Sequence, residues 1–302
     1  MEAPPGYPTI IPGGCWKLKK PIYGLKQVAW CWYACLQTEL EKSSFHVTSS
    51  PCVFVTKGHI IASHVDAMIS LAKDKSLHDL TKSDLSKSFK IHDLGDLSFY
   101  LGMKFTQDHM HCIIEIAQDH YIHNILEQHN LLNSCPFSVL MQVSLQLKKQ
   151  SQLLDMATLC EYQQMIGSLM YAVTGTQPDL TFTACYLSQF ANTPGSDHLD
   201  TMKYTFHYLA GTTNLVLMFN CSRPLDLIGY VNSDWASNPI DHHSITGYCF
   251  MIGRNPISSS SQKQPTITLS STKGEYMATT KATHKAIQLQ RLLSNLGFPR
   301  PH

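Results

Sequence analysis

The sequence predicts an α+β fold, and three observations lead to this class. Trp32, Leu36 and Leu40 repeat at a four-residue spacing, which is typical of one face of a helix. Short β-branched or apolar runs separated by turn residues follow between positions 52 and 72, which indicates a β-meander. Beyond Asn220 the pattern changes to strands and ends in a long helical stretch. The hydrophobic fraction of 43% is sufficient for a packed core.

The first half of the chain is predicted to alternate helices with short strands. A helix is expected over Val28–Lys42, and the spacing of leucines indicates a second one over Leu77–Phe89. Between them, Lys57-Gly58 forms the first turn of the meander and Asp66 lies in the second. The other expected elements are the meander strands Cys52–Thr56, His59–Ser63 and Met68–Ala72, a hairpin of Leu97–Phe105 with Cys112–Ile116, and a helix over Tyr121–Gln128.

The second half is predicted to be helical first and stranded afterwards. Residues 135–154 lose periodicity and are rich in Ser and Gln, so we expect a connector there. Helices follow over Thr158–Thr174, Pro178–Phe190 and Asp197–Ala210, the second with Pro at the favoured first position. The last expected elements are the strands Leu225–Val231, Gly247–Ile252 and Thr266–Leu269 and a helix from Thr272 to about Leu296.

Composition excludes several classes of protein. No apolar run approaches the roughly 20 residues that span a bilayer, and the Pro- and Gly-rich start lacks the features of a secretion signal. We therefore expect a soluble intracellular chain that is not secreted, in a compartment that the sequence leaves open. Ten cysteines without a CxxC pair favour free thiols over a zinc site or a disulfide framework. His109-Met110-His111-Cys112 and His242-His243 lack further ligands at metal-binding spacing, which favours ordinary surface histidines.

Several short motifs follow one another along nearly the whole chain. The earlier ones are Met1-Glu2-Ala3-Pro4-Pro5-Gly6-Tyr7, Tyr23-Gly24-Leu25-Lys26-Gln27, His64-Val65-Asp66-Ala67 and Asp93-Leu94-Gly95-Asp96. The later ones are Tyr208-Leu209-Ala210-Gly211-Thr212, Ser244-Ile245-Thr246-Gly247-Tyr248, Lys263-Gln264-Pro265 and Lys273-Gly274-Glu275-Tyr276. Together they resemble the reverse transcriptase of Ty1/copia-type retrotransposons, followed by the ribonuclease H domain of the same Pol polyprotein.

This resemblance implies a domain order for the predicted elements. Residues 1–134 are expected to form a partial reverse transcriptase that contains part of the polymerase palm. Residues 135–220 would be a connector with thumb- or connection-like helices. Residues 221–302 would be a truncated ribonuclease H-like domain with a mixed α/β sheet.

The resemblance places a polymerase metal site at Asp66. Nucleotidyl transfer uses two Mg²⁺ ions held by carboxylates, and the family supplies two adjacent acids at the turn that here reads Asp66-Ala67. His64 stands where the family usually has Tyr. The chain begins inside the Met-Glu-x-Pro-Pro-Gly motif, so we expect the palm's first Asp, which precedes that motif, to be absent. Asp66 is therefore either the remnant of a Mg²⁺ ligand or an ordinary turn residue, and productive Mg²⁺ binding is not expected.

The resemblance also places the nuclease acids. The family's first-strand acid has become Asn232, whose amide donates where a metal ligand must accept. Glu275 matches the helix acid that would bind Mg²⁺, and Lys273 stands where the family usually has Glu. Asp234 is a remnant catalytic candidate, but it lies two positions along the strand, some 6–7 Å from the original ligand. The chain also stops before the family's next catalytic Asp, so we expect no nuclease activity.

Three functions follow from these residues. The leading one is a catalytically defective remnant of a Ty1/copia Pol polyprotein, ancestrally an RNA-directed DNA polymerase with ribonuclease H, whose partner in the family is an RNA or DNA template-primer. The second is a noncatalytic module that binds nucleic acid weakly or serves another interaction. It rests on Lys17, Lys19, Lys20 and Lys26, which form either a binding patch or a solvated loop in a chain of net charge +1. The third, an enzyme completed by a partner, is disfavoured by Ala67 and Asn232. The oligomeric state stays open.

Overall fold

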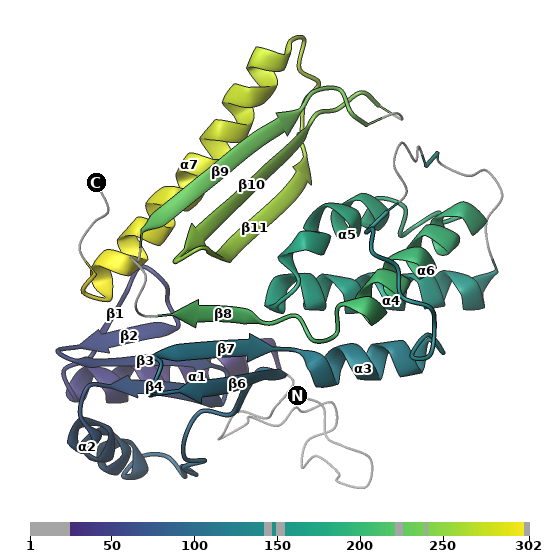
Figure 1. Ribbon diagram of the computed structural model, residues 1–302. Coiled ribbons are helices and arrows are strands. Elements are labelled where there is room, and N and C mark those ends of the chain that lie inside the picture. Colours follow the sequence, from purple (N-terminus) through teal and green to yellow (C-terminus); the bar gives the residue numbers. More distant parts are fainter. Residues whose placement is uncertain (1–24, 142–146, 149–154, 221–225, 239–240, 299–302) are drawn as a thin grey trace, which may run out of the picture. The chain divides into compact units, whose positions relative to one another are not determined.

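The computed structural model describes residues 25–141, 147–148, 155–220, 226–238 and 241–298 (Figure 1). The chain divides into two compact units, and each is described by itself. The first contains the described residues up to Leu94 together with Ser294–Phe298, and the second contains residues 95–293.

The first unit is a four-stranded antiparallel meander flanked by two helices. Helix α1 spans Lys26–Lys42 and α2 spans Lys75–Ser86. The strands, in the order β1-β2-β3-β4, are β1 (His46–Val47), β2 (Val53–Thr56), β3 (His59–His64) and β4 (Ala67–Ala72). Leu36 and Leu40 of α1 bury completely against Phe54 of β2. The four-residue repeat predicted from the sequence therefore marks the core face of α1.

The second unit contains a sheet whose last strand comes from far along the chain. Its strands, in the order β5-β6-β7-β8, are β5 (Phe99–Tyr100), β6 (Met103–Asp108), β7 (Ile113–Ala117) and β8 (Leu217–Asn220). The pairing of β7 with β8 is antiparallel, with Ile114 opposite Phe219. The chain between these two strands forms a group of helices.

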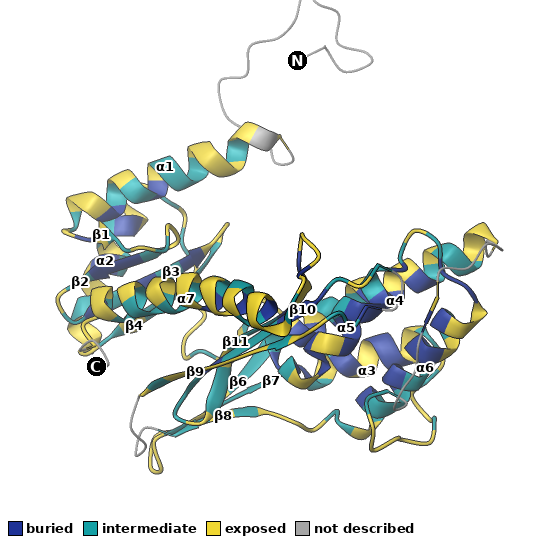
Figure 2. Ribbon diagram, turned by 90° about the horizontal axis from the view of Figure 1, so that it is seen from above, coloured by how far each residue is buried: buried dark blue, intermediate teal, exposed yellow. Residues whose placement is uncertain are grey.

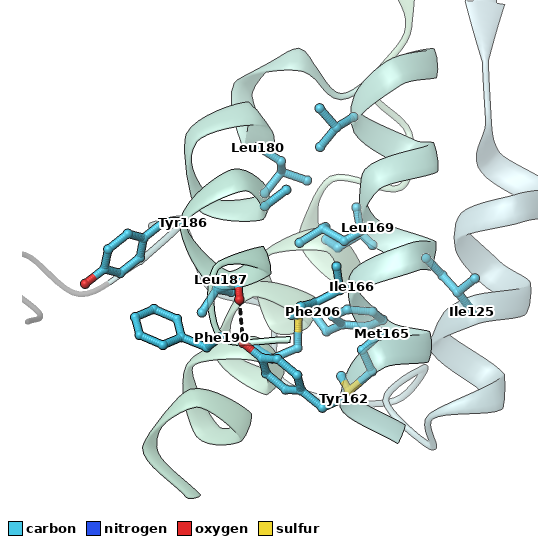
Figure 3. Close-up of a cluster of buried hydrophobic side chains, with 14 of the residues drawn as sticks. Ile125, Tyr162, Met165, Ile166, Leu169, Leu180, Tyr186, Leu187, Phe190 and Phe206 are labelled. Carbon is cyan, nitrogen blue, oxygen red and sulfur yellow. Dashed lines mark hydrogen bonds between the residues drawn. The ribbon is translucent and has the colours of Figure 1, made fainter. Parts of the chain in front are cut away.

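These helices hold the larger hydrophobic core. They are α3 (Asp119–Gln128), α4 (Met156–Gly175), the 3₁₀ turn η1 (Pro178–Leu180), α5 (Thr181–Ser188) and α6 (Ser196–Gly211). Figure 2 colours many residues of α4, α5 and α6 as buried, whereas β6, β7 and β8 are largely intermediate. Within the core, the hydroxyl of Tyr162 donates a hydrogen bond of 2.9 Å to the carbonyl of Leu187 (Figure 3). Asp155 caps α4 by accepting from the backbone N–H groups of Ala157 and Thr158.

The last part of the second unit is a three-stranded antiparallel sheet with a long helix along it (Figure 1). Its strands, in the order β11-β10-β9, are β9 (Leu227–Asp234), β10 (Ile245–Ile252) and β11 (Asn255–Lys263), and the helix is α7 (Ser271–Asn295). Helix α5 packs against the outer edge of β11, where the hydroxyls of Thr181 and Ser259 are 2.9 Å apart. A helix that covers an edge strand protects its unpaired backbone groups from other chains.

The structure confirms the mixed helix and sheet character and corrects two predicted strands. The strand predicted over Leu97–Phe105 is divided by a turn at residues 101–102 into β5 and β6, which pair with each other. The helices predicted over Val28–Lys42, Leu77–Phe89 and Thr158–Thr174 are present within a few residues of their expected bounds. The strand predicted over Thr266–Leu269 was wrong, because these residues are irregular and the third strand is β11. Four consecutive serines from Ser258 to Ser261 gave β11 little of the apolar alternation by which strands are predicted.

Candidate functional site

The tight turn between β3 and β4 presents Asp66. His64 and Ala67 pair across the hairpin, so Val65 and Asp66 form a two-residue loop. Val65 adopts φ 55°, a left-handed conformation that is costly for a β-branched residue. The indole N–H of Trp32 on α1 donates to the carbonyl of Val65, which holds the strained residue in place. Strain of this kind gathers at functional sites.

The chemistry available at this turn is that of a single carboxylate. Asp66 is exposed, and the next position is Ala67, which brings no ligand atom. Among the residues that the structure describes, no group of three or more His, Cys, Asp or Glu side chains could hold a metal ion. A two-metal centre needs several carboxylates around ions about 4 Å apart. The described residues therefore do not fit such a centre.

The second predicted site lies where α7 meets β9. The backbone N–H of Ser233 donates to the carboxylate of Glu275 at 3.3 Å, which fixes the acid beside the strand. The side chain of Ser233 points toward α7, because a Cβ added at Gly274 would lie 2.8 Å from its Oγ. Neighbours along a strand face opposite sides, so Asn232 and Asp234 project from the other face of the sheet. The structure thus brings Glu275 to the backbone of β9 and sends the other two predicted side chains away from α7.

A buried glutamine between the strands and α7 was missed by the sequence reasoning. Gln264 is 3% exposed, and its amide nitrogen has three acceptors, the hydroxyls of Ser233 (3.2 Å) and Thr246 (3.0 Å) and the carbonyl of Gly274 (3.0 Å). One side chain thereby joins β9, β10 and α7. A glutamine in a loop gives no sequence signal of burial, since Gln is usually exposed. The signal that could have found it was the motif Lys263-Gln264-Pro265.

The basic patch predicted at the N-terminus cannot be placed. Lys17, Lys19 and Lys20 lie outside the described residues. Lys26 is the first residue of α1, and its side chain is not described.

The histidine-rich segment predicted from the sequence forms the turn between β6 and β7. There His111 Nδ1 is 2.6 Å from the carboxylate of Asp108, and this contact, followed by the backbone N–H of His111, lowers the pKa of Asp108.

A hollow of about 420 Å³ lies near the start of α7. Its lining is largely apolar or hydroxyl-bearing and consists of Thr266, Ile267, Thr268, Leu269, Lys273, Tyr276 and Met277. Nothing in this lining supplies a carboxylate. Throughout the described ranges, no helix has the length and apolar character needed to cross a bilayer.

Comparison with known proteins gives consistent matches. The profile of the family described as reverse transcriptase (RNA-dependent DNA polymerase) matches residues 1–162. The retrovirus-related Pol polyprotein from transposon TNT 1-94 of Nicotiana tabacum is 35% identical over 294 residues, which are 93% of this chain and 22% of that protein. The corresponding polyproteins from transposons RE1 and RE2 of Arabidopsis thaliana are each 31% identical, over 99% and 100% of this chain and 20% and 21% of theirs. The chain spans about a fifth of the length of these curated relatives.

Proposed function

The chain belongs to the reverse transcriptase family of copia-type retrotransposon Pol polyproteins, and from this premise we propose that it is a remnant of such a polyprotein that does not catalyse nucleotidyl transfer. Reverse transcriptases bind a nucleic-acid template and use divalent metal ions. A polymerase centre at the β3–β4 turn would therefore need carboxylates that hold these ions.

The observation that carries the proposal is the composition of this turn. Its geometry is that of a tight hairpin held by Trp32, which supports its assignment as the turn where the family carries two adjacent acids. Only Asp66 is an acid, however, and Ala67 occupies the second position. Mg²⁺ dehydrates reluctantly and is held by carboxylates together with substrate phosphates. Loss of ligands that supply several kcal/mol of transition-state stabilisation lowers the rate by on the order of 10³ or more.

The assignment of the C-terminal part is a proposal of the same kind. We assign β9, β10, β11 and α7 to the beginning of a ribonuclease H-like domain, residues 135–220 to the connector and thumb- or connection-like helices, and the preceding residues to the palm. The antiparallel order β11-β10-β9 followed by a helix supports this assignment. With Asn232 in place of the first-strand acid and Lys273 near Glu275, the nuclease centre is proposed to be inactive as well.

Primer extension on an RNA template tests the proposal. We expect no incorporation by the purified chain with either Mg²⁺ or Mn²⁺, and no rescue by Ala67→Asp alone, because residues that act as one unit fail nonadditively. Asp66→Asn serves as the control for residual activity at the turn. Template-dependent incorporation that disappears in Asp66→Asn would refute the proposal.

A second candidate function is noncatalytic nucleic-acid binding, which the sequence motivates through Lys17, Lys19, Lys20 and Lys26. Neutralising about four phosphates gives a log–log dependence of affinity on salt with a slope of roughly −3 to −4. Filter binding of a labelled oligonucleotide at several salt concentrations measures this slope. Unchanged affinity after all four lysines are replaced by Gln removes the patch from consideration.

A further inference from the structure

A chain of hydrogen bonds crosses from β3 through β4 to α2 in the first unit. His59 Nε2 is 2.7 Å from Ser70 Oγ, and the same hydroxyl is 2.9 Å from His78 Nδ1. The other ring nitrogen of His59, Nδ1, is 3.3 Å from Thr81 Oγ1. We refer to His59, Ser70, His78 and Thr81 as the histidine latch. Its members come from three elements, and His59 is only 1% exposed.

The direction of each hydrogen bond follows from the number of protons available. Thr81 donates its hydroxyl proton to the carbonyl of Leu77 at 3.0 Å, so it must accept from His59 Nδ1–H. Burial, and then the charge of His78, lower the pKa of His59, so this ring is neutral and its Nε2 is an acceptor. Ser70 therefore donates to His59, and having one proton it can only accept from His78 Nδ1–H.

The outer end of the latch meets charged groups. His78 Nε2 is 3.8 Å from the carboxylate of Asp93, and Lys82 of α2 is 2.7 Å from the same oxygen. The hydrogen bond to Asp93, and to a lesser extent the negative charge of Asp79 on α2, raise the pKa of Lys82. The inner end has uncharged neighbours, since His59 pairs with Thr56 on β2 and Ala72 on β4, and the ring of Phe45 packs against it at 5.1 Å between centroids.

We propose that the histidine latch releases α2 from the β3–β4 hairpin as the pH falls below about 6.5, the ordinary pKa of histidine. As long as His78 carries its proton on Nδ1, a proton added to His59 Nε2 removes the acceptor of Ser70, whose own proton then has no partner in the latch. It also makes His59 Nε2 a donor, so that N–H groups of both rings point at the single hydroxyl of Ser70. The hydroxyl of Ser70 then faces two donors and no acceptor, and α2 is the element that can separate because it contributes His78 and Thr81.

The direction of the pH dependence follows from the difference between the pKa of His59 in the folded and in the unfolded state. The folded-state pKa of His59 lies below its unfolded value, so its contribution to stability is complete above about pH 6.5 and is lost as the pH falls toward the folded pKa. Within that window, each pH unit raises the opening equilibrium of α2 by at most about tenfold, the limit for one proton. The proposal does not depend on the proposed function, because none of the four residues lies in the β3–β4 turn.

Amide hydrogen exchange of the full chain at pH 7.5 and pH 5.0 tests the proposal, with labelling times scaled to the intrinsic rate at each pH. We expect peptides covering α2 to lose protection at pH 5.0 while peptides covering α7 do not. In His78→Gln, whose side-chain amide can turn its oxygen toward Ser70 and accept the released proton, the loss should be smaller. His46→Gln, an exposed histidine on β1, is the matched control and should behave like the unmodified chain. Equal protection of α2 at both pH values, or an undiminished loss in His78→Gln, would overturn the proposal.

The pKa of His59, measured in the unsubstituted chain, tests the proposal independently. Deuterium exchange at the imidazole C2 carbon, followed by mass spectrometry, yields the pKa of each histidine in the intact chain. We expect His59 to titrate below its ordinary value of about 6.5. A value at or above 6.5 would mean that the ring accepts a proton without penalty, and the latch would be rejected.

Discussion

Replacing Gly274 by Ala tests how closely α7 approaches β9. The added Cβ would lie 2.8 Å from Ser233 Oγ and 3.6 Å from the hydroxyls of Ser244 and Thr268, and only the first distance is too short. Overpacking costs about 1–3 kcal/mol, whereas Ala in place of Gly gains at most about 1 kcal/mol in a helix. We therefore expect Gly274→Ala to destabilise the local structure by up to about 2 kcal/mol.

A double-mutant cycle separates the contact from the helix propensity. Ser233→Ala removes the clashing oxygen, and it costs little because Gln264 keeps two other acceptors for its two N–H groups. In this background Gly274→Ala should be neutral or stabilising, which gives a coupling energy of about 1–3 kcal/mol. Gly167 on α4 is the matched control, since a Cβ there meets nothing within 4 Å and Gly167→Ala should stabilise.

Local hydrogen exchange measures the stabilities of the variants in this cycle. Peptides covering Leu227–Asp234 and Ser271–Asn295 report the opening free energy of β9 and α7 directly, without assuming that the whole chain unfolds in one step. A coupling energy near zero, or a Gly274→Ala variant as stable as the unmodified chain, would refute the close approach and with it the placement of Glu275 beside β9.

Three further outcomes are expected. Val65→Gly should stabilise the β3–β4 hairpin by roughly 0.5–1 kcal/mol in hydrogen exchange, because relief of left-handed strain exceeds the entropic cost of Gly; faster exchange would contradict this. Tyr162→Phe should cost about 1–3 kcal/mol and lower the melting temperature, since the buried carbonyl of Leu187 loses its donor; an unchanged melting temperature would show that the bond contributes nothing. Burial, followed by the 2.6 Å bond to Asp179, raises the pKa of Tyr208 to about 12. The contribution of Tyr208 to the free energy of unfolding should therefore be complete below pH 10 and be lost between pH 10 and 12. Tyr208→Phe should reduce this loss of stability in alkaline denaturation.

The helices and the meander could be predicted because their signals are local. Leu36 and Leu40 repeat at the helical period, and the turn at Asp66 separates two apolar runs, so each pattern is complete within a short window. Strand β11 could not be predicted in this way. Its serines are stabilised by a partner far along the chain, as in the contact of Ser259 with Thr181. Tertiary context decides strands more than intrinsic preference does.

The candidate site was predictable in position and not in geometry. The motif around Asp66 located the turn, but the left-handed backbone of Val65 and the hydrogen bond from Trp32 depend on α1 packing beside the hairpin. Glu275 was likewise proposed from its motif, whereas its contact with the backbone of Ser233 could not be predicted. Gln264 and the histidine latch were missed because their partners lie on three different elements, which no single window of sequence contains.

The pairing of β7 with β8 has a consequence for the order of folding. About 100 residues lie between these two strands, and closing an unstructured loop of that length costs conformational entropy that increases with the logarithm of its length. Helices α3, α4, α5 and α6 are local structures that form rapidly by comparison. Once they have collapsed around Tyr162, the effective loop is much shorter and β8 reaches β7 at a lower cost. The sheet should therefore be completed last, with the helical core as its template.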